Sequence, residues 1–352
     1  MSENDARAES LRLIRDSAAA IAPRGGDFAR IRALRFTHSG FDRAVWGEIC
    51  AMGWVGLSLP EEKGGAGLGM AEYCALAEEF GAGLVPEPLI PAVLAASFLP
   101  EAWRADHLAG KRLVLPAWQE KPGTLLAPFA TTFADGAVSG RKVFVSMANA
   151  ADAFLVATDA GLALVEADGE GVSLVTSPTQ DGGHFGTVTF EDSPATPLPG
   201  DFAPALEAAS LASSAYLLGL MDRVFALTLD YLRTREQFGQ KIGAFQALQH
   251  RCADLKILLE LTRASVASAA TVLDTSNDYA ARACAVSRAK ARASDAALRM
   301  TREAIQLHGG IAYTDEFAIG LFLRKAMLIA SMFGTGARHR ARYAALAPES
   351  EE

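Results

Sequence analysis

The sequence lacks the signature of a membrane-spanning helix, because no run of about 18 uncharged apolar residues occurs in it. It also lacks the start of a signal peptide. Its first ten residues, MSENDARAES, are polar and acidic, whereas a signal peptide has basic residues followed by an apolar stretch. These absences predict a cytoplasmic protein that does not insert into a membrane.

Basic residues and cysteines are both scarce. The 33 Lys and Arg are outnumbered by 41 Asp and Glu, for a net charge of −8. This balance argues against a general electrostatic role on nucleic acid or anionic lipid, and it leaves room for a local basic pocket. The four cysteines, Cys50, Cys74, Cys252 and Cys284, lie far apart and lack the spacing of a zinc site. We expect buried thiols, no disulfide and no metal site.

The 352 residues are half apolar, enough for two or three cooperating units. Residues 1–110 read as helical, with apolar residues at steps of three and four, such as Phe41, Val45 and Ile49. Residues 111–200 change to short alternating runs broken by Gly, Asp and Pro, typical of antiparallel strands. The helical period returns over 201–352. We therefore predict an α+β fold with an N-terminal α-helical domain (1–110), a middle β domain (111–200) and a C-terminal helical domain (201–352).

Two segments depart from ordinary amphipathic patterning. The first, Arg233–Gln246, reads RTREQFGQKIGAFQ and places arginines and glycines beside helix ends. Guanidinium donors and free backbone N–H groups both favour phosphate, although an arginine at a helix C-terminus also complements the helix dipole. The second, Gln306–Glu316, reads QLHGGIAYTDE. Its paired glycines fit a helix C-cap and also permit close approach of a ligand to the backbone.

Together and in this order, the two segments resemble the acyl-CoA dehydrogenase family. The matching patterns are R-x-x-F-G-x-x-I-x-x-F-Q-x-x-Q-H at 235–250 and Q-x-x-G-G-x-x-Y-x-x-E at 306–316, with G-W-x-x-L-x-x-P-E-E-x-G-G-x-G at 53–67 as a third. The resemblance covers nearly the whole chain. It implies an α-helical domain, a small antiparallel β barrel and a C-terminal four-helix bundle, with FAD held between subunits of a dimer or dimer of dimers. It also implies an acyl-CoA substrate and an electron-transfer flavoprotein as electron acceptor.

The resemblance carries cofactor roles to particular positions in the C-terminal domain. Arg235 is similar to the residue that reaches across the dimer to the FAD pyrophosphate, and Phe238 and Gln246 are similar to its neighbours against that cofactor. A further three positions resemble those that offer a side chain and bare backbone to the adenosine and pyrophosphate of a neighbouring subunit's FAD: Gln306, Gly309 and Gly310.

In the β domain, the segment Lys142–Ser146 resembles the family's K-x-W-I-T strand. The resemblance places Phe144 against the flavin ring and Ser146 within reach of its N5 and O4 edge, because an aromatic face covers a flat ring and a hydroxyl hydrogen-bonds to it. The family's T-E-P-x-A-G-S-D loop, which grips flavin and acyl-CoA, aligns near 117–123. Only fragments of that loop survive here.

The catalytic base is missing from both places where the family carries it. Dehydrogenation of an acyl-CoA needs a carboxylate to remove the α proton. The family's I-Y-E-G-T segment aligns with Ser331–Thr335, so Phe333 stands at the base position and Thr335 remains as a residue that can hydrogen-bond to FAD. The alternative base position, on the first helix of the C-terminal bundle, holds Ala209. Glu207 lies two residues away, on a different helix face.

These features predict the base-deficient subunit of a heteromeric acyl-CoA dehydrogenase, similar to the bacterial α2β2 enzymes that act on steroid side chains. A second acyl-CoA dehydrogenase-like subunit would then supply the base, and this chain would supply residues to FAD. Three alternatives stay open. They are a homo-oligomeric dehydrogenase with an unrecognised base, a flavoprotein with different chemistry, and a non-catalytic scaffold or binding protein. Retention of a phosphate-binding arginine and bare glycines argues against the scaffold.

Overall fold

The computed structural model describes residues 3–26, 28–123, 125–126 and 128–347. Contacts divide the chain into two compact units. The helical unit comprises residues 1–28, 70–85 and 210–352, and the sheet unit comprises residues 29–69 and 86–209. The α7 helix, Phe202–Thr234, begins in the sheet unit and continues into the helical unit.

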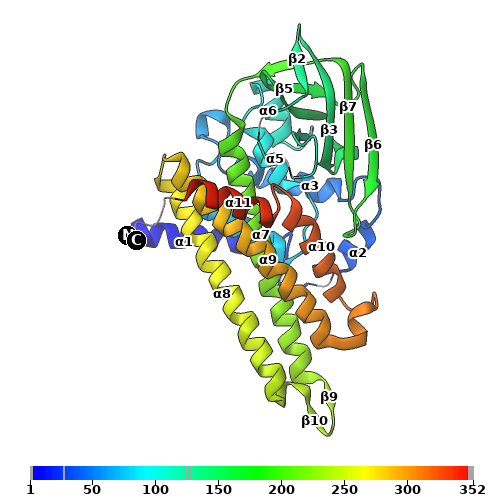
Figure 1. Cartoon of the computed structure of the whole chain (residues 1–352), viewed down its shortest axis with the longest axis vertical. Helices are drawn as coiled ribbons and strands as arrows, with labels where there is room; N and C mark the ends of the chain where they lie inside the picture. The colour runs from blue at the N-terminus through cyan, green and yellow to red at the C-terminus, as the bar shows by residue number, and fades with distance from the viewer. Residues whose placement is uncertain (1–2, 27, 124, 127, 348–352) are drawn as a thin grey trace. The chain divides into compact units, whose positions relative to one another are not determined.

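The helical unit is built from long helices that run beside one another (Figure 1). Its described elements are α1 (Glu3–Ala18), α4 (Met70–Ala82), most of α7, β9 (Glu236–Gln237), β10 (Gln240–Lys241), α8 (Gln246–Thr275), α9 (Tyr279–His308), α10 (Ile319–Ser331) and α11 (Gly336–Leu346). Short 3₁₀ turns lie at Ile242–Ala244 and Gly309–Tyr313. The central helix is α9, which packs against α8, α10 and α11.

Glycine and a group of ion pairs fix how α4 meets the other helices of this unit. A Cβ at Gly219 of α7 would lie 1.7 Å from the carbonyl oxygen of Glu78, and one at Gly81 would lie 1.9 Å from that of Tyr216. The two helices therefore touch backbone to backbone. Around this crossing three arginines from α1, α8 and the segment after α1 bind the carboxylates of Glu78, Glu79 and Asp222, at N–O distances of 2.6–3.1 Å: Arg15, Arg24 and Arg263.

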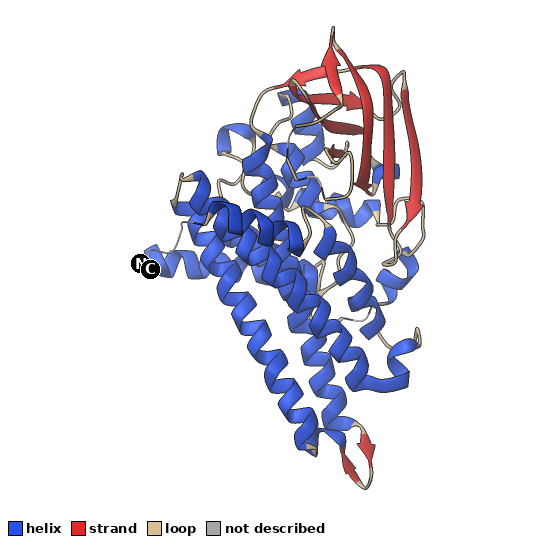
Figure 2. Cartoon of the chain, in the orientation of Figure 1, coloured by secondary structure: helices blue, strands red, loops and turns tan. Residues whose placement is uncertain are grey.

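The sheet unit contains two four-stranded sheets, shown in red in Figure 2. Their orders are β1-β4-β5-β8 and β2-β3-β7-β6. The strands are β1 (Val114–Ala117), β2 (Thr132–Ala134), β3 (Ala137–Ser146), β4 (Ala153–Thr158), β5 (Gly161–Glu166), β6 (Val172–Pro178), β7 (His184–Pro194) and β8 (Thr196–Leu198). Four helices precede them: α2 (Ala29–Leu34), α3 (Arg43–Ala51), α5 (Leu89–Ala96) and α6 (Glu101–Leu108).

The predicted order of helices, strands and helices is confirmed, and the strands fall between residues 114 and 198 apart from the short β9–β10 ribbon. One detail differs from the antiparallel expectation. Strand β1 pairs with β4 in parallel, from Val114 opposite Ala153 to Ala117 opposite Val156. Parallel pairing requires a long crossover, and the 35 residues between these strands, which include β2 and β3, provide it. The boundaries of the three predicted domains stay a prediction.

The stretch Ile319–Leu346 is apolar and long enough to be a candidate membrane span by composition, and 56% of its most apolar window is buried. It consists of α10 and α11, separated by the loop at Met332–Thr335. Because the candidate is broken and half buried, it fits the core of the helical unit.

Candidate functional site

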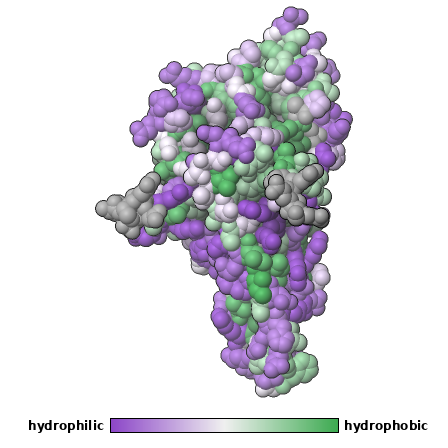
Figure 3. Space-filling model, turned by 60° about the vertical axis from the view of Figure 1, so that its left-hand side comes forward, coloured by the Kyte–Doolittle hydropathy of each residue, from purple (hydrophilic) through white to green (hydrophobic). Residues whose placement is uncertain are grey.

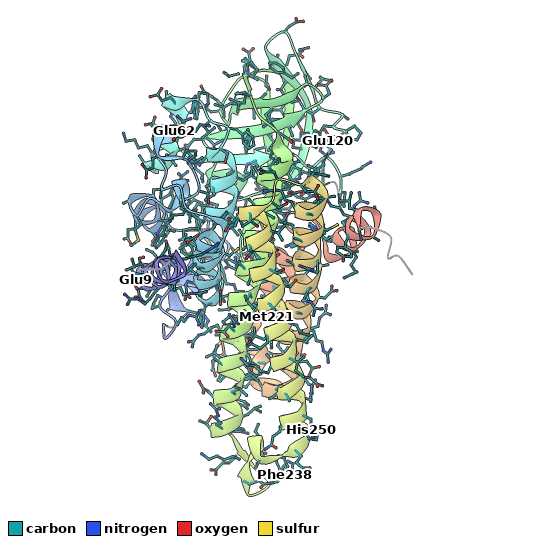
Figure 4. All side chains as sticks on the ribbon, turned by 90° about the vertical axis from the view of Figure 1, so that its left-hand side faces the viewer. Glu9, Glu62, Glu120, Met221, Phe238 and His250 are labelled. Carbon is teal, nitrogen blue, oxygen red and sulfur yellow. The ribbon has the colours of Figure 1, made fainter. Side chains whose placement is uncertain are left out.

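The first cofactor motif forms the end of α7 and a two-residue hairpin. The backbone N–H of Arg235 donates to the carbonyl of Tyr231, and the Arg235 carbonyl accepts from Ile242, each at 2.9 Å. The hairpin turn consists of Phe238 and Gly239, both at positive φ (54° and 77°), as a type I′ turn requires. A bulky residue rarely adopts this conformation. The turn holds the Phe238 ring 91% exposed at the far end of the helical unit (Figure 4).

The second motif forms the end of α9. Gln306 lies exposed in the last turn of this helix, and Gly309 follows as its C-cap with φ 68° and ψ −148°. Residues with a Cβ rarely adopt this conformation. A Cβ added at Gly309 or Gly310 would meet nothing within 4 Å. The backbone of this glycine pair is therefore open to an approaching group.

An aromatic cluster brings the two motifs together. Tyr231, one turn before Arg235, stacks on His308 with ring centroids 4.4 Å apart, and Phe317 packs edge-on against Tyr231 at 5.8 Å. The Nδ1 of His308 lies 2.7 Å from the Ala304 carbonyl, and burial lowers the pKa of this histidine. His308 is thus a neutral packing residue. Sequence analysis missed Tyr231, although an aromatic residue four positions before Arg235 shares its helix face.

Gln246, the first residue of α8, is exposed at the same end of the helical unit. The Phe238 and Phe245 rings pack edge-on at 6.2 Å, so the hairpin is braced against the start of α8. A salt bridge between Arg251 and Glu303 joins α8 to α9 at this end. Four of the predicted cofactor residues, Arg235, Phe238, Gln246 and Gln306, and the Gly309–Gly310 pair therefore gather at one exposed end.

The predicted flavin residues of the β domain lie at a bulge in β3. Its register with β7 shifts between Lys142 and Val145, and Phe144 within the shift has φ 58°. The bulge leaves the Phe144 ring 39% exposed, with its edge against Phe185 at 5.8 Å. Ser146 ends the strand opposite Phe185. Bulges often mark ligand sites because they redirect a side chain, and this one leaves an aromatic side chain partly exposed.

The segment aligned with the family's flavin loop is folded around Glu120. Its carboxylate accepts the backbone N–H groups of Ala130 and Thr131, the Thr131 hydroxyl, and the Lys142 ammonium at 2.8 Å. Burial by itself raises the pKa of Glu120, but these donors outweigh it and lower the pKa to about 2. The Lys142 side chain is fully buried. The carboxylate of Glu120 and the ammonium of Lys142 are therefore satisfied by contacts within the chain.

Phe333, which stands at the predicted base position, is buried (1% exposed) and has φ 54°. Its carbonyl accepts the hydroxyl of Ser210 at 3.1 Å and lies 2.9 Å from Nε2 of His339. The Thr335 hydroxyl caps α11 by accepting from the backbone of Arg338 at 3.3 Å. The loop between α10 and α11, which holds the predicted base position, is therefore held in place by side chains of α7 and α11.

A buried lysine lies under this loop. Lys290 of α9 donates to the Ser213 hydroxyl at 2.9 Å and to the carbonyl of Ile329, in the last turn of α10, at 2.7 Å. Burial lowers its pKa to about 7, and the pKa of His339, which feels its charge, to about 4. The lysine satisfies a helix-end carbonyl that would otherwise lack a partner.

At the other base position, Ala209 is 1% exposed, and Glu207 is 4% exposed on the same helix. Residues two apart on a helix project about 200° from each other, so Glu207 does not replace a side chain at position 209. Both predicted base positions therefore hold side chains that cannot accept a proton, and their assignment as base positions stays a prediction.

Comparison with known proteins identifies the family. The N-terminal domain model of the acyl-CoA dehydrogenases matches residues 8–100, and their C-terminal domain model matches residues 204–346. Acyl-CoA dehydrogenase IpdE2 of Mycobacterium tuberculosis is 30% identical, covering 90% of this chain and 91% of its own length. The chain belongs to the acyl-CoA dehydrogenase family. IpdE2 of Mycolicibacterium smegmatis is 31% identical over 93% of this chain and 95% of that protein.

Solved acyl-CoA dehydrogenase structures share the fold. A variant of the Tcur3481–Tcur3483 steroid ACAD is 29% identical, with a TM-score of 0.88 over 96% of this chain and 98% of that chain. The ChsE4–ChsE5 complex from Mycobacterium tuberculosis is 24% identical, with a TM-score of 0.87 over 98% of both chains. The predicted family and fold are confirmed. Acyl-CoA dehydrogenases are FAD-dependent oxidoreductases that act on CH–CH groups.

The exposed end of the helical unit fits the diphosphate part of such a cofactor. Arg235 offers a guanidinium fork that matches phosphate geometry, and Gln306 offers an amide. The glycine pair leaves backbone open where a side chain would stand in the way of a ligand. Phe144 and Ser146 of the sheet unit and Thr335 of the helical unit stay predicted flavin residues. The individual cofactor roles remain predictions.

Proposed function

We propose that this chain is the base-deficient subunit of a heteromeric FAD-dependent acyl-CoA dehydrogenase. The observation that carries the proposal is Phe333, a buried phenyl ring on a loop whose carbonyl is fixed from two helices. A phenyl ring accepts no proton, so the carboxylate that removes the α proton would belong to a second acyl-CoA dehydrogenase-like subunit. When bound, FAD would supply the acceptor for the hydride from the β carbon.

In this arrangement the chain's own contribution is to hold the cofactor of its partner. Arg235 and the Gly310 backbone would bind the diphosphate, Gln306 would contact the adenosine, and Phe238 would pack against the cofactor from its exposed turn. The exposure of these residues supports the proposal, because a residue that contacts a partner's cofactor must lie at the surface of its own chain, and Phe238 is 91% exposed. The helices also expose Ile257 and Leu261 of α8, and Figure 3 shows a hydrophobic band on this unit.

The proposal includes the setting in which the enzyme works. We place it in the cytoplasm as a dimer of dimers, with an acyl-CoA as substrate and an electron-transfer flavoprotein as electron acceptor. The likeness to a steroid ACAD, at 29% identity, supports testing acyl-CoAs with a steroid ring system first.

The test is expression of the chain alone and together with the acyl-CoA dehydrogenase-like product of a neighbouring gene. FAD per chain is counted from absorbance, and turnover is measured with straight, branched and steroid acyl-CoAs. We expect turnover only from the joint preparation, with more FAD bound than by the chain alone. Brisk turnover by the flavin-saturated chain on its own would refute the proposal.

A second candidate follows from the buried carboxylate of Glu207, 4% exposed on α7. In it the chain is a homo-oligomeric dehydrogenase in which Glu207 is the base. The Glu207→Gln variant separates the two, because loss of a general base lowers the rate about 10²- to 10⁴-fold. If Glu207 is the base, the variant of the chain alone should show this loss of rate. If the chain is the base-deficient subunit, the chain alone has no activity with or without the substitution. If neither the chain alone nor the joint preparation binds flavin, the result favours the non-catalytic scaffold.

A further inference from the structure

A cleft between α8, α9 and α11 carries an unusual concentration of arginine. The cleft is open to solvent and has a volume of about 440 Å³, within the range of small-ligand sites. Four of its ten lining residues are arginines, three on α9 and one on α11, against one aspartate: Arg288, Arg292, Arg299, Arg340 and Asp295. In a chain of net charge −8, this concentration of positive charge is local.

The pattern of α9 explains how the arginines come to share the cleft. Most of this helix is buried against α8, α10 and α11, and from Ala285 to Glu303 its exposed side chains are four arginines and one aspartate. Positions 288, 292, 295, 299 and 302 follow the helical period and form one stripe. Arg288 and Arg292 lie about 6 Å apart along the axis, and Arg299 about 10 Å beyond Arg292.

Most of this charge is uncompensated within the described chain. Asp295 pairs with Arg340 across the cleft. Arg288 donates to the Ser268 hydroxyl at 3.1 Å, and neither Arg292 nor Arg299 makes a hydrogen bond or ion pair with any described residue. Like charges four residues apart destabilise a helix, so the Arg288–Arg292 pair opposes folding in the absence of an anion.

The chemistry of the lining selects the kind of anion. Guanidinium groups bind phosphate and carboxylate in bidentate fashion, and several along one stripe suit a ligand with separated negative groups. The ring of Tyr343 and the side chain of Leu258 form an apolar part of the wall. A cleft of this volume, bounded by three helices of one chain, favours a small molecule over a protein surface.

We propose that this cleft binds a small phosphorylated anion, of the type of a diphosphate or a nucleotide bearing more than one phosphate. Arg292 and Arg299 are the main phosphate donors, and Tyr343 lies beside the less polar part of the ligand. This site is separate from the cofactor motifs around Arg235, and the proposal does not rest on the proposed function.

The test is calorimetric titration of the purified full-length chain with inorganic pyrophosphate, with phosphate, ADP and CoA as comparison ligands. We expect saturable pyrophosphate binding that weakens with salt and is tighter than phosphate binding. Arg292→Gln and Arg299→Gln should each weaken it about tenfold or more, the range for a lost charge-assisted contact. CoA binding tighter than ADP would identify the extra phosphate as part of the ligand, and equal affinities would identify the diphosphate alone.

Two matched variants decide whether the cleft is the site. Arg302→Gln removes an exposed arginine from the same stripe of α9 outside the lining, and Arg235→Ala removes the cofactor arginine. Each should change pyrophosphate affinity less than twofold. The proposal is overturned by an absence of saturable binding, by an equal loss in Arg302→Gln, or by loss in Arg235→Ala. Tighter binding of an acidic peptide than of pyrophosphate would also overturn it, because the cleft would then belong to a protein partner.

Discussion

Replacing Arg235 by Ala should lower FAD binding by the assembled enzyme and leave the fold intact. The side chain is exposed, and the backbone of Arg235 makes its hydrogen bonds within the described fold, with Tyr231 and Ile242 at 2.9 Å. An alanine keeps both backbone bonds. We therefore expect the free energy of unfolding to change by no more than about 0.5 kcal/mol.

The loss of cofactor affinity can be estimated from the chemistry of the contact. A charge-assisted hydrogen bond from guanidinium to phosphate contributes about 1.5–3 kcal/mol. Since about 1.4 kcal/mol corresponds to a factor of ten, the dissociation constant for FAD should rise about 10- to 100-fold. The effect should appear only in the complex with the partner subunit, because Arg235 is proposed to act on the partner's cofactor.

The assay is fluorescence titration of FAD into the flavin-stripped complex, with urea unfolding of each variant beside it. Arg233→Ala is the matched control. Arg233 lies two residues earlier, also exposed, and pairs only weakly with Asp230 at 3.7 Å. If the two variants bind FAD equally well, or if Arg235→Ala loses helicity, Arg235 has no specific role in holding the cofactor.

The remaining predictions concern packing and buried charge. Gly219→Ala should lower the free energy of unfolding by about 3 kcal/mol in urea titration, because the new Cβ would lie 1.7 Å from the backbone oxygen of Glu78. The control is Gly47→Ala in helix α3, where a Cβ would meet nothing within 4 Å and should not destabilise the protein. Glu120→Gln should destabilise by about 2 kcal/mol or more at pH 7, since it leaves Lys142 buried without a charge partner. The pKa of Glu120 is lowered to about 2, so this difference should be complete above about pH 4.5 and disappear as the pH falls towards 2; a difference independent of pH would contradict it. Lys290→Met should flatten the pH dependence of stability. The pKa of Lys290 is about 7 in the folded protein against a usual 10.5, so unfolding takes up a proton between these pH values and the wild type becomes more stable as the pH rises. Urea midpoints at pH 6.5 and 9.5 measure the difference. An equal rise in the variant would assign the dependence to another group.

Helical and strand periods followed from local sequence because each side chain reports which face of its element is buried. The two motifs could also be placed at helix ends from the sequence, because their arginines and glycines mark such ends; α7 ends at Thr234 and α9 at His308. The prediction of a missing base also rests on spacing alone. The structure places Phe333, the predicted base position, on the loop between α10 and α11.

Several features depended on contacts between distant residues, which no local pattern encodes. The stacking of Tyr231 on His308 joins segments 77 positions apart, and Glu120 gathers donors from residues 130, 131 and 142. The parallel pairing of β1 with β4 is decided in the same way, because a strand's own sequence does not name its partner.

The sequence by itself determined the family and the order of helices and strands, and it predicted the two base positions without an acid, because these depend on residue type and spacing. Tertiary structure alone decided which groups meet. It exposed Phe238 at the tip of its turn, buried Lys290 under the Phe333 loop, and lined one cleft with arginines from α9 and α11. The physical reason is that burial and charge pairing depend on neighbours brought together by folding, and those neighbours lie tens to hundreds of residues apart.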